Sequence, residues 1–212
     1  MRSTKSWTTI IEAMIAMFIV IVWIIWVFTI YTKSQKLATS TENRIKAISI
    51  AREWIEAMQN IRDTNWILFW ADPQNCWNVQ DYNIWCLWDN LGNNKITPWD
   101  YKIYKDIDNR WKLISGNVAS SLDYSSWAYR TDYEVKLDPN WLYTQSWWTW
   151  LIPIFTRKIN ISYPEDTNSD LAFNRLDEKM LVKSIVSWAD NSKIWFYTVN
   201  LENLLTNWKK DD

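Results

Sequence analysis

Residues 5–33 read KSWTTIIEAMIAMFIVIVWIIWVFTIYTK, and this stretch decides the fold of the chain. A short basic leader, with Arg2 and Lys5, precedes one acidic residue, Glu12, and an apolar run that continues to Ile30. Segment 8–31 as a helix would be about 36 Å long, at about 1.5 Å per residue, which is enough to cross a bilayer. Because a carboxylate is costly inside such a segment, Glu12 is predicted to have a function.

The helix is predicted to continue beyond the apolar run. After Lys33 the chain becomes polar, but neither Gly nor Pro interrupts it, and apolar residues then recur every three or four positions. This stripe consists of Ile45, Ile48, Ala51, Ile55, Met58 and Ile61. The pattern predicts one helix from Thr8 to about Ile61, roughly 80 Å long, with an amphipathic second part over residues 32–62. The polar residues 63–65 predict its end.

From residue 63 to 212 the sequence predicts one β-rich head without a second domain. Short β-type runs alternate with turn residues. The predicted elements are a hairpin from 100–107 and 112–114, strands at 128–137 and 154–163, a second hairpin from 180–188 and 193–199, and a closing turn or helix at 201–208. The predicted fold class is therefore α+β, with a long N-terminal helix packed on an antiparallel sheet.

The composition is unusual in its tryptophans and glycines. The chain has 19 Trp and 2 Gly, although Gly normally makes up about 7% of a protein. Trp also occupies turn positions that favour Gly, as in Asp108-Asn109-Arg110-Trp111 and Asp138-Pro139-Asn140-Trp141, and it clusters in the stretch 146–150. We hypothesise that many of these residues are Gly, encoded by UGA in a lineage that reads this codon as Gly. The alternative is a genuinely Trp-rich protein.

With Gly at position 7, the N-terminal junction resembles the prepilin-type cleavage and methylation segment of type IV pilins and pseudopilins. Proteins of that family have a short basic leader, Gly before the cleaved bond and Glu as the fifth residue of the mature chain. Trp7 stands at the Gly position, Thr8 would be the new N-terminus, and Glu12 is then fifth. The departures are Trp7 itself and Thr8, where the family usually has Phe.

The resemblance implies a leader at 1–7, cleavage after Trp7 by a prepilin peptidase, N-methylation of Thr8, and a role for Glu12 in subunit assembly. Segment 8–31 would be the transmembrane and assembly helix. Partners would be other pilin subunits, an assembly platform and the membrane, with the head outside the cell. Segments 51–66 and 182–208 also resemble minor pilin-like proteins. In those proteins the position of Trp54 is Gly, whereas Trp66, Trp188 and Trp208 match true Trp residues.

Cys76 and Cys86 lie close together in the sequence, after the predicted helix. In an exported head they are expected to form a disulfide worth up to about 3 kcal/mol, and free thiols are the alternative. A zinc site is not expected, because two thiols in a chain without His do not supply four good zinc ligands.

Enzymatic activity and a cofactor are not expected. The chain has no His, which excludes the usual Ser-His and Cys-His pairs, and it has no phosphate-binding loop. The net charge of −1 gives no general signal for nucleic acid, although local basic patches leave a DNA-uptake role open. Residues 166–170 are a weak candidate for calcium binding.

Two other functional classes remain open. One is an uncleaved, single-pass membrane-anchored surface binding protein or adhesin. The other is a membrane-tethered hydrolase that uses paired carboxylates. The candidate acids are Asp123, Asp132, Glu134, Asp138, Glu165, Asp166, Asp170, Asp177 and Glu178.

Overall fold

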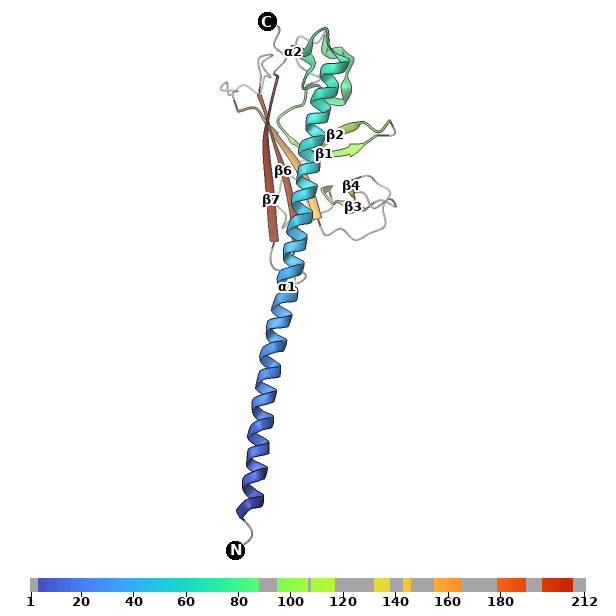
Figure 1. Cartoon of the computed structure of the whole chain (residues 1–212). Helices are drawn as coiled ribbons and strands as arrows, with labels where there is room; N and C mark the ends of the chain where they lie inside the picture. The colour runs from blue at the N-terminus through green and yellow to red at the C-terminus, as the bar shows by residue number, and fades with distance from the viewer. Residues whose placement is uncertain are drawn as a thin grey trace. The chain divides into compact units, whose positions relative to one another are not determined.

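The computed structural model describes residues 4–87, 95–106, 108–116, 132–137, 143–145, 155–164, 179–189 and 196–207. Its longest element is α1, a single helix from Thr4 to Leu68 (Figure 1). The chain divides into two units, Met1–Ile45 and Lys46–Asp212, and the division falls within α1. α1 therefore contributes to both units.

The prediction of one unbroken helix from Thr8 to about Ile61 is confirmed, and α1 extends beyond both ends of that range. No Gly or Pro occurs within α1, so the helical hydrogen-bond ladder is nowhere interrupted by a missing N–H. Thr29, Thr39 and Thr41 also donate their hydroxyl hydrogens to backbone carbonyls one turn earlier, at 2.8–3.1 Å. These hydroxyl groups are thereby satisfied within the helix itself.

The predicted end of the helix at residues 63–65 is wrong, because α1 continues to Leu68. The side-chain amide of Asn65 donates hydrogen bonds to the carbonyl oxygens of Trp77 and Val79, at 3.2 and 3.0 Å. Asn usually ends a helix because its side chain competes for hydrogen bonds with the nearby helix backbone. The side chain of Asn65 instead binds the chain that follows the helix, so it does not compete in this way.

In the second unit, residues 46–68 of α1 bury one stripe of side chains. The stripe consists of Ala47, Ile50, Ala51, Trp54, Ala57, Met58 and Ile61. The prediction is confirmed at Ala51, Met58 and Ile61, but Ile45 is 63% exposed, and Ile48 and Ile55 are only half-buried. The prediction relied on isoleucines, whereas small alanines allow the helix to pack closely against the sheet.

Five strands form the main sheet, in the order β2-β1-β5-β6-β7, and every pair is antiparallel. The strands are β1 (Asp100–Lys105), β2 (Trp111–Ser115), β5 (Phe155–Ser162), β6 (Lys179–Ala189) and β7 (Phe196–Thr206). A second, small sheet pairs β3 (Lys136–Leu137) with β4 (Tyr143–Thr144). Between α1 and β1 lie α2 (Pro73–Cys76), η1 (Gln80–Tyr82) and η2 (Ile84–Leu87). The α+β fold class is confirmed.

Both predicted hairpins are confirmed, as β1–β2 and β6–β7, and β5 matches the strand predicted at 154–163. The strand predicted at 128–137 is shorter where the structure describes it: within 132–137, only Lys136–Leu137 forms a strand. Tyr133 and Val135 are instead bound to β5, through one backbone hydrogen bond to Arg157 and one to Phe155.

The closing turn or helix predicted for residues 201–208 is wrong, because β7 continues as a strand to Thr206. Val199 and Leu201 pack against the core below α1, and Leu205 belongs to it. These three residues are two and four positions apart, and in a strand such spacings place side chains on the same face. The pattern also fits a short helix, and pairing with β6 decides between the two.

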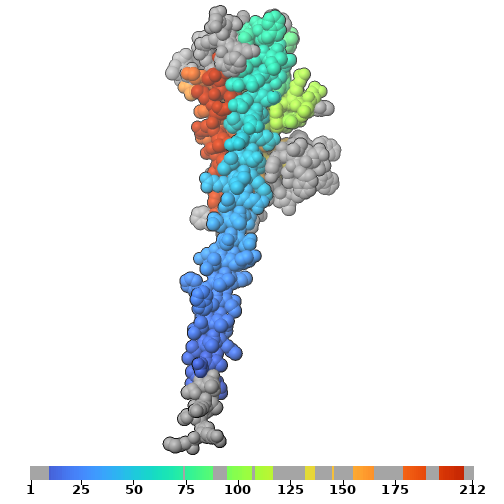
Figure 2. All heavy atoms as spheres, in the orientation of Figure 1, coloured from blue at the N-terminus to red at the C-terminus, as the bar shows by residue number. Residues whose placement is uncertain are grey.

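The core lies between the sheet and α1. In both views α1 lies side by side with β7, an edge strand of the sheet (Figures 1 and 2). Near the start of this part of α1, Ile50 packs with Val186 and Val199, and near its end Met58 packs with Val182 and Leu205. The residue numbers increase together along α1 and β7, so the two elements run in the same direction.

Candidate functional site

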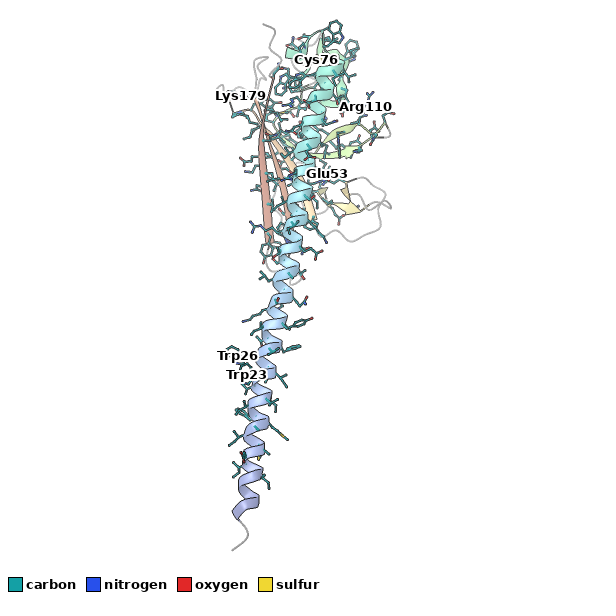
Figure 3. All side chains as sticks on the ribbon, viewed as in Figure 1. Trp23, Trp26, Glu53, Cys76, Arg110 and Lys179 are labelled. Atoms are coloured by element: carbon teal, nitrogen blue, oxygen red, sulfur yellow. A yellow bond between two sulfur atoms is a disulfide. The ribbon has the colours of Figure 1, made fainter. Side chains whose placement is uncertain are left out.

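The first unit presents an apolar surface around the whole circumference of α1. Every large apolar side chain from Ile10 to Ile30 is exposed, by 38–68%, and Trp23 and Trp26 project from it (Figure 3). In the part of the chain that the structure describes, α1 is the one helix long and apolar enough to cross a membrane. A helix that is apolar on all sides needs apolar surroundings. We call Ile10–Ile30 the candidate membrane segment.

Glu12 is the one charged residue in the candidate membrane segment. The side chains of Ile11, Ile15, Ala16 and Ile19 surround it. Because Ala16 is small and lies one helical turn further on, the surface beside the carboxylate is open to a neighbouring group. No cation in the described part of the chain pairs with Glu12. The carboxylate is therefore available to a partner.

Trp7 and Thr8 lie on helical backbone, because α1 begins at Thr4. Thr8 precedes Glu12 by about one helical turn. The side chains of residues 1–9 lie outside the described residues. A peptidase acting between Trp7 and Thr8 would need the first turns of α1 to open, which is a low-energy event at the end of a helix.

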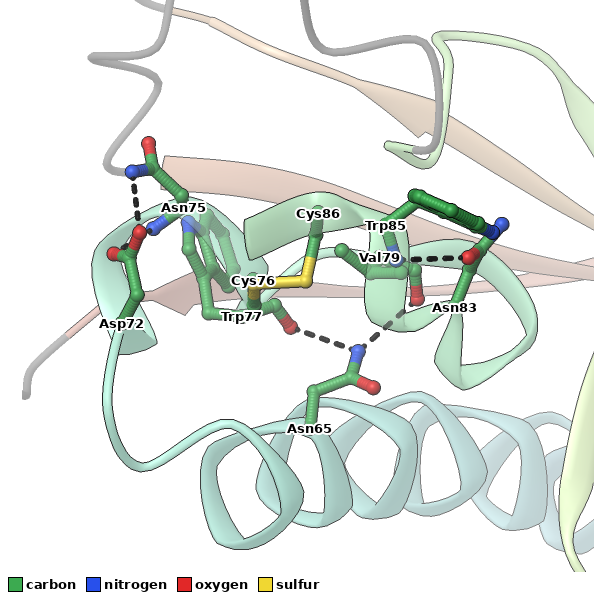
Figure 4. The surroundings of a disulfide bond; sticks show 9 residues. All are labelled: Asn65, Asp72, Asn75, Cys76, Trp77, Val79, Asn83, Trp85 and Cys86. Carbon is green, nitrogen blue, oxygen red and sulfur yellow. Dashed lines mark hydrogen bonds between the residues drawn. A yellow bond between two sulfur atoms is a disulfide. The ribbon is translucent and has the colours of Figure 1, made fainter. Parts of the chain in front are cut away.

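The predicted disulfide between Cys76 and Cys86 is confirmed (Figure 4). The two Cα atoms are 5.4 Å apart, and both residues are buried, together with Phe69 and Val79. Asn65 of α1 holds the same loop from the other side, through its hydrogen bonds to Trp77 and Val79. The end of α1 is thus fixed to a covalently closed loop.

The disulfide loop covers the outer edge of β2. Gln80 donates a hydrogen bond to the carbonyl oxygen of Leu113 at 3.3 Å, and the hydroxyl of Tyr82 donates one to that of Trp111 at 2.8 Å. Asp81 and Tyr82 have positive φ values of 56° and 55°, a conformation that costs a residue other than Gly about 1–3 kcal/mol. No pattern in the sequence predicts this contact.

A buried arginine, Arg157 of β5, is a second feature that sequence reasoning missed. Its side chain is 1% exposed, and its Nη1 lies 3.3 Å from Oε2 of Glu53 on α1. Its guanidinium carbon is 3.5 Å from the centroid of the Trp54 ring. Burial lowers the pKa of Arg157 to about 9, against the opposing effect of Glu53. The desolvation penalty of a buried charge can exceed its attraction to one partner, so this ion pair is weak evidence for stability.

Two buried tryptophans of α1 differ in how their indole N–H groups are satisfied. Trp66 donates a hydrogen bond to Oδ1 of Asn207 at 3.3 Å, and Arg62 lies 4.5 Å from its ring. Trp54 is fully buried, but among the residues that the structure describes its Nε1 has no hydrogen-bond partner. Leaving a buried donor unpaired costs about 1–3 kcal/mol, so the indole N–H group is well accommodated at position 66 and poorly at position 54.

The turn between β1 and β2 does not require Gly at position 111. The residue with positive φ is Asn109, at 59°, whereas Trp111 begins β2. Asn tolerates this conformation, so the interpretation of Trp111 as a misplaced Gly loses its geometric reason. Trp141 and the cluster at 146–150 lie outside the described residues.

The candidate acids that the structure describes are paired with lysines. Asp132 binds Lys102, and Glu134 lies 3.6 Å from Lys136. The remaining seven, including the possible calcium loop at 166–170, lie outside the described residues. Within the described residues, no three potential metal ligands gather. The geometry of Asp132 and Glu134 is that of ordinary ion pairs on a protein surface.

Comparison with protein-family models, with curated proteins and with solved structures finds no match for this chain.

Proposed function

We propose that this chain is a minor pilin or pseudopilin, a membrane-inserted precursor that assembles into a type IV pilus-like or type II secretion-like fibre. The observation that carries the proposal is α1. It is apolar on every side from Ile10 to Ile30, has one acid near its start, and continues unbroken into a segment that a β-sheet covers. An all-apolar helix suits both lipid and a bundle of similar helices, so the same segment can pass from one to the other.

In this proposal a prepilin peptidase removes residues 1–7 and Thr8 becomes the N-methylated first residue. The precursor spans the cytoplasmic membrane with its head outside. An assembly platform then transfers it into a fibre at the cell surface, where it contacts other pilin subunits. Cleavage leaves α1 intact from Thr8 onward, so both the candidate membrane segment and the head remain in the mature protein.

Glu12 would pair with the free amine of a neighbouring subunit. A charged side chain within the membrane costs about 2.5–3.5 kcal/mol at the centre of a helix and less near its ends. Pairing with an amine removes much of this penalty and sets the register of the two subunits. The open surface beside Ala16 gives such an amine access to the carboxylate.

A permanently anchored surface binding protein is the second candidate, and the identity of residue 7 favours it. If this residue is Trp in the cell, the peptidase would meet a large ring where Gly is expected. The precursor would then keep its leader and never assemble.

The test replaces Glu12 by Ala in the native host, with Glu56→Ala, an exposed acid of α1 in the head, as the matched control. We expect Glu12→Ala to abolish fibre assembly while the protein remains in the membrane, and Glu56→Ala to assemble normally. Peptide mass spectrometry should find an N-terminal peptide that begins at methylated Thr8. A peptide that begins at Met1 or Arg2, or normal assembly of Glu12→Ala, would refute the fibre proposal.

We also propose that part of the 19 Trp positions are Gly in the cell, through UGA codons read as Gly. The unpaired indole of Trp54 supports this, and the well-bonded Trp66 serves as the internal control. The coding DNA should contain UGA at codon 54 and UGG at codon 66. UGG at both codons would show that Trp54 is native.

A further inference from the structure

The two outer edges of the main sheet are treated differently. β2 is a short edge of 5 residues, and Gln80 and Tyr82 of the disulfide loop hydrogen-bond to its carbonyl oxygens. β7 is an edge of 11 residues that, among the strands that the structure describes, pairs only with β6. For residues 197–206 of β7, the described part of the chain offers no other backbone partner.

β7 also lacks the features that normally protect an exposed edge from pairing with another strand. Such edges are usually short, bulged, or interrupted by Pro or Lys. β7 contains neither Pro nor Lys, and its register with β6 runs from Phe196 to Thr206 without a bulge. Its one charged residue, Glu202, is paired with Lys183 of β6 at 2.7 Å. The edge is therefore long, regular and nearly uncharged.

We propose that β7 is an interaction surface that pairs, antiparallel, with β7 of a second copy of this chain. Two copies related by a two-fold axis at Leu201 would overlap along the whole strand, because Leu201 is the central residue of β7. A second copy always supplies an edge of the same length and pattern, and pairing satisfies the free N–H and C=O groups of both strands.

The charge on β7 is compatible with this register. When Leu201 faces its own copy, Glu202 faces Asn200, a neutral residue that can donate a hydrogen bond to a carboxylate. A register centred one residue later would place Glu202 opposite Glu202, and like charges directly opposite are destabilising. Maximum overlap and the absence of charge repulsion thus select the same register.

The pairing would be limited to two copies. It stops at a dimer because the other edge of the sheet, β2, is covered by the disulfide loop. Since α1 and β7 run in the same direction, the two-fold axis reverses both. The inference is independent of the proposed function, because it needs only the head.

Cysteine cross-linking of the full chain in detergent tests the proposal. Asn200 and Glu202 are exposed, and in the proposed register their Cα atoms lie about 4.5–5.5 Å apart across the interface, within disulfide range. We expect a mixture of the Asn200→Cys and Glu202→Cys proteins to form several-fold more covalent dimer than either protein alone. Ser115→Cys, at an exposed position of β2, is the matched edge control and should give little dimer.

Each other result contradicts the proposal. Equal cross-linking in the mixture and in the single variants would indicate dimers formed through α1 or by random collision. Cross-linking of Ser115→Cys at the level of the mixture would show that β7 is not special. A lack of dimer in every sample would show that the β7 edge does not pair with itself, and fibre assembly through Glu12 would be unaffected by that outcome.

Discussion

The two parts of α1 contain similar apolar residues but are surrounded in different ways. In the candidate membrane segment, Ile19 is 51% exposed, and the large apolar side chains on the other faces of the helix are exposed as well. In the head, Ile50 is 1% exposed and faces the sheet. Ile45, the last residue of the first unit, is 63% exposed. One continuous helix therefore passes from a part that the protein leaves uncovered to a part that it covers.

The difference teaches that the arrangement of apolar residues, more than their number, defines the surroundings of a helix. A stripe on one face can be covered by one sheet, as residues 47–61 are. An apolar surface on every face cannot be covered by one sheet, so it needs lipid or several neighbouring helices. Four predictions test this contrast, beginning with the largest expected effect.

Two lysines in the candidate membrane segment should release the protein from the membrane. Ile19→Lys with Ile24→Lys adds about 5–7 kcal/mol to the free energy of insertion, at about 2.5–3.5 kcal/mol per charge. The matched control is Leu37→Lys with Ile45→Lys, at residues that are also well exposed but lie outside the segment. Alkaline extraction of membranes measures the retained fraction. Equal retention of both variants would show that Ile10–Ile30 does not anchor the chain.

The same substitution on either side of the division within α1 should have different effects on stability. Ile50→Ala removes fully buried methyl groups, so we expect it to lower the free energy of unfolding by about 2–5 kcal/mol. Ile45→Ala, at an exposed site, should change it by less than about 0.5 kcal/mol. Urea unfolding of the two variants measures both values. Similar losses would mean that the head covers more of α1 than residues 47–61.

At the C-terminal end of α1, a buried and an exposed Asn provide a finer comparison. Asn65→Ala leaves the carbonyl oxygens of Trp77 and Val79 without their donor, which should cost about 1–3 kcal/mol. Asn60→Ala, at an exposed helix position, should be neutral or slightly stabilising, because Ala has the higher helix propensity. Thermal unfolding distinguishes them. A neutral Asn65→Ala would indicate that the disulfide alone holds the loop.

The smallest expected effect is the pH dependence of the free energy of unfolding that arises from Arg157, which contacts α1. The pKa of Arg157 is about 9 in the folded protein, well below the pKa of an arginine in the unfolded chain, so the unfolded chain binds more protons above about pH 9. The stability of the wild-type protein relative to Arg157→Met should therefore rise with pH, by about 1 kcal/mol near pH 10.

Urea unfolding between about pH 7 and 10 measures this pH dependence. The control is Arg52→Met, an exposed residue of α1, which should leave the pH dependence unchanged. A constant difference between wild type and Arg157→Met over this range would show that Arg157 is better solvated than its burial implies.

Much of the architecture could be predicted from local patterns. The unbroken helix followed from the absence of Gly and Pro, and both hairpins followed from alternating residues around turn sequences. The errors occurred where long-range partners override local preference. Residues 63–65 looked like a helix end until Asn65 found acceptors in the next loop, and residues 201–208 looked like a turn until β6 paired with them.

The candidate site divides in the same way. Glu12 was identifiable because one acid in an apolar run is visible in the sequence itself, and the disulfide because only two cysteines are present. Arg157 was not identifiable, since nothing near it in sequence indicates that β5 brings it beneath α1, against Glu53 and Trp54. The exposed edge of β7 was also invisible, because strand order is a property of the whole sheet.

Local patterns in the sequence are sufficient to predict the long helix, its apolar first part with Glu12, and the alternation of strands in the head. These are local properties, set by backbone propensity and by the spacing of apolar residues along one element. Local patterns do not reveal which face of α1 is buried, where α1 ends, how Arg157 is paired or, among the described strands, which sheet edge has no second partner. These depend on contacts between residues far apart in the chain, whose side chains meet only when the sheet and α1 pack together.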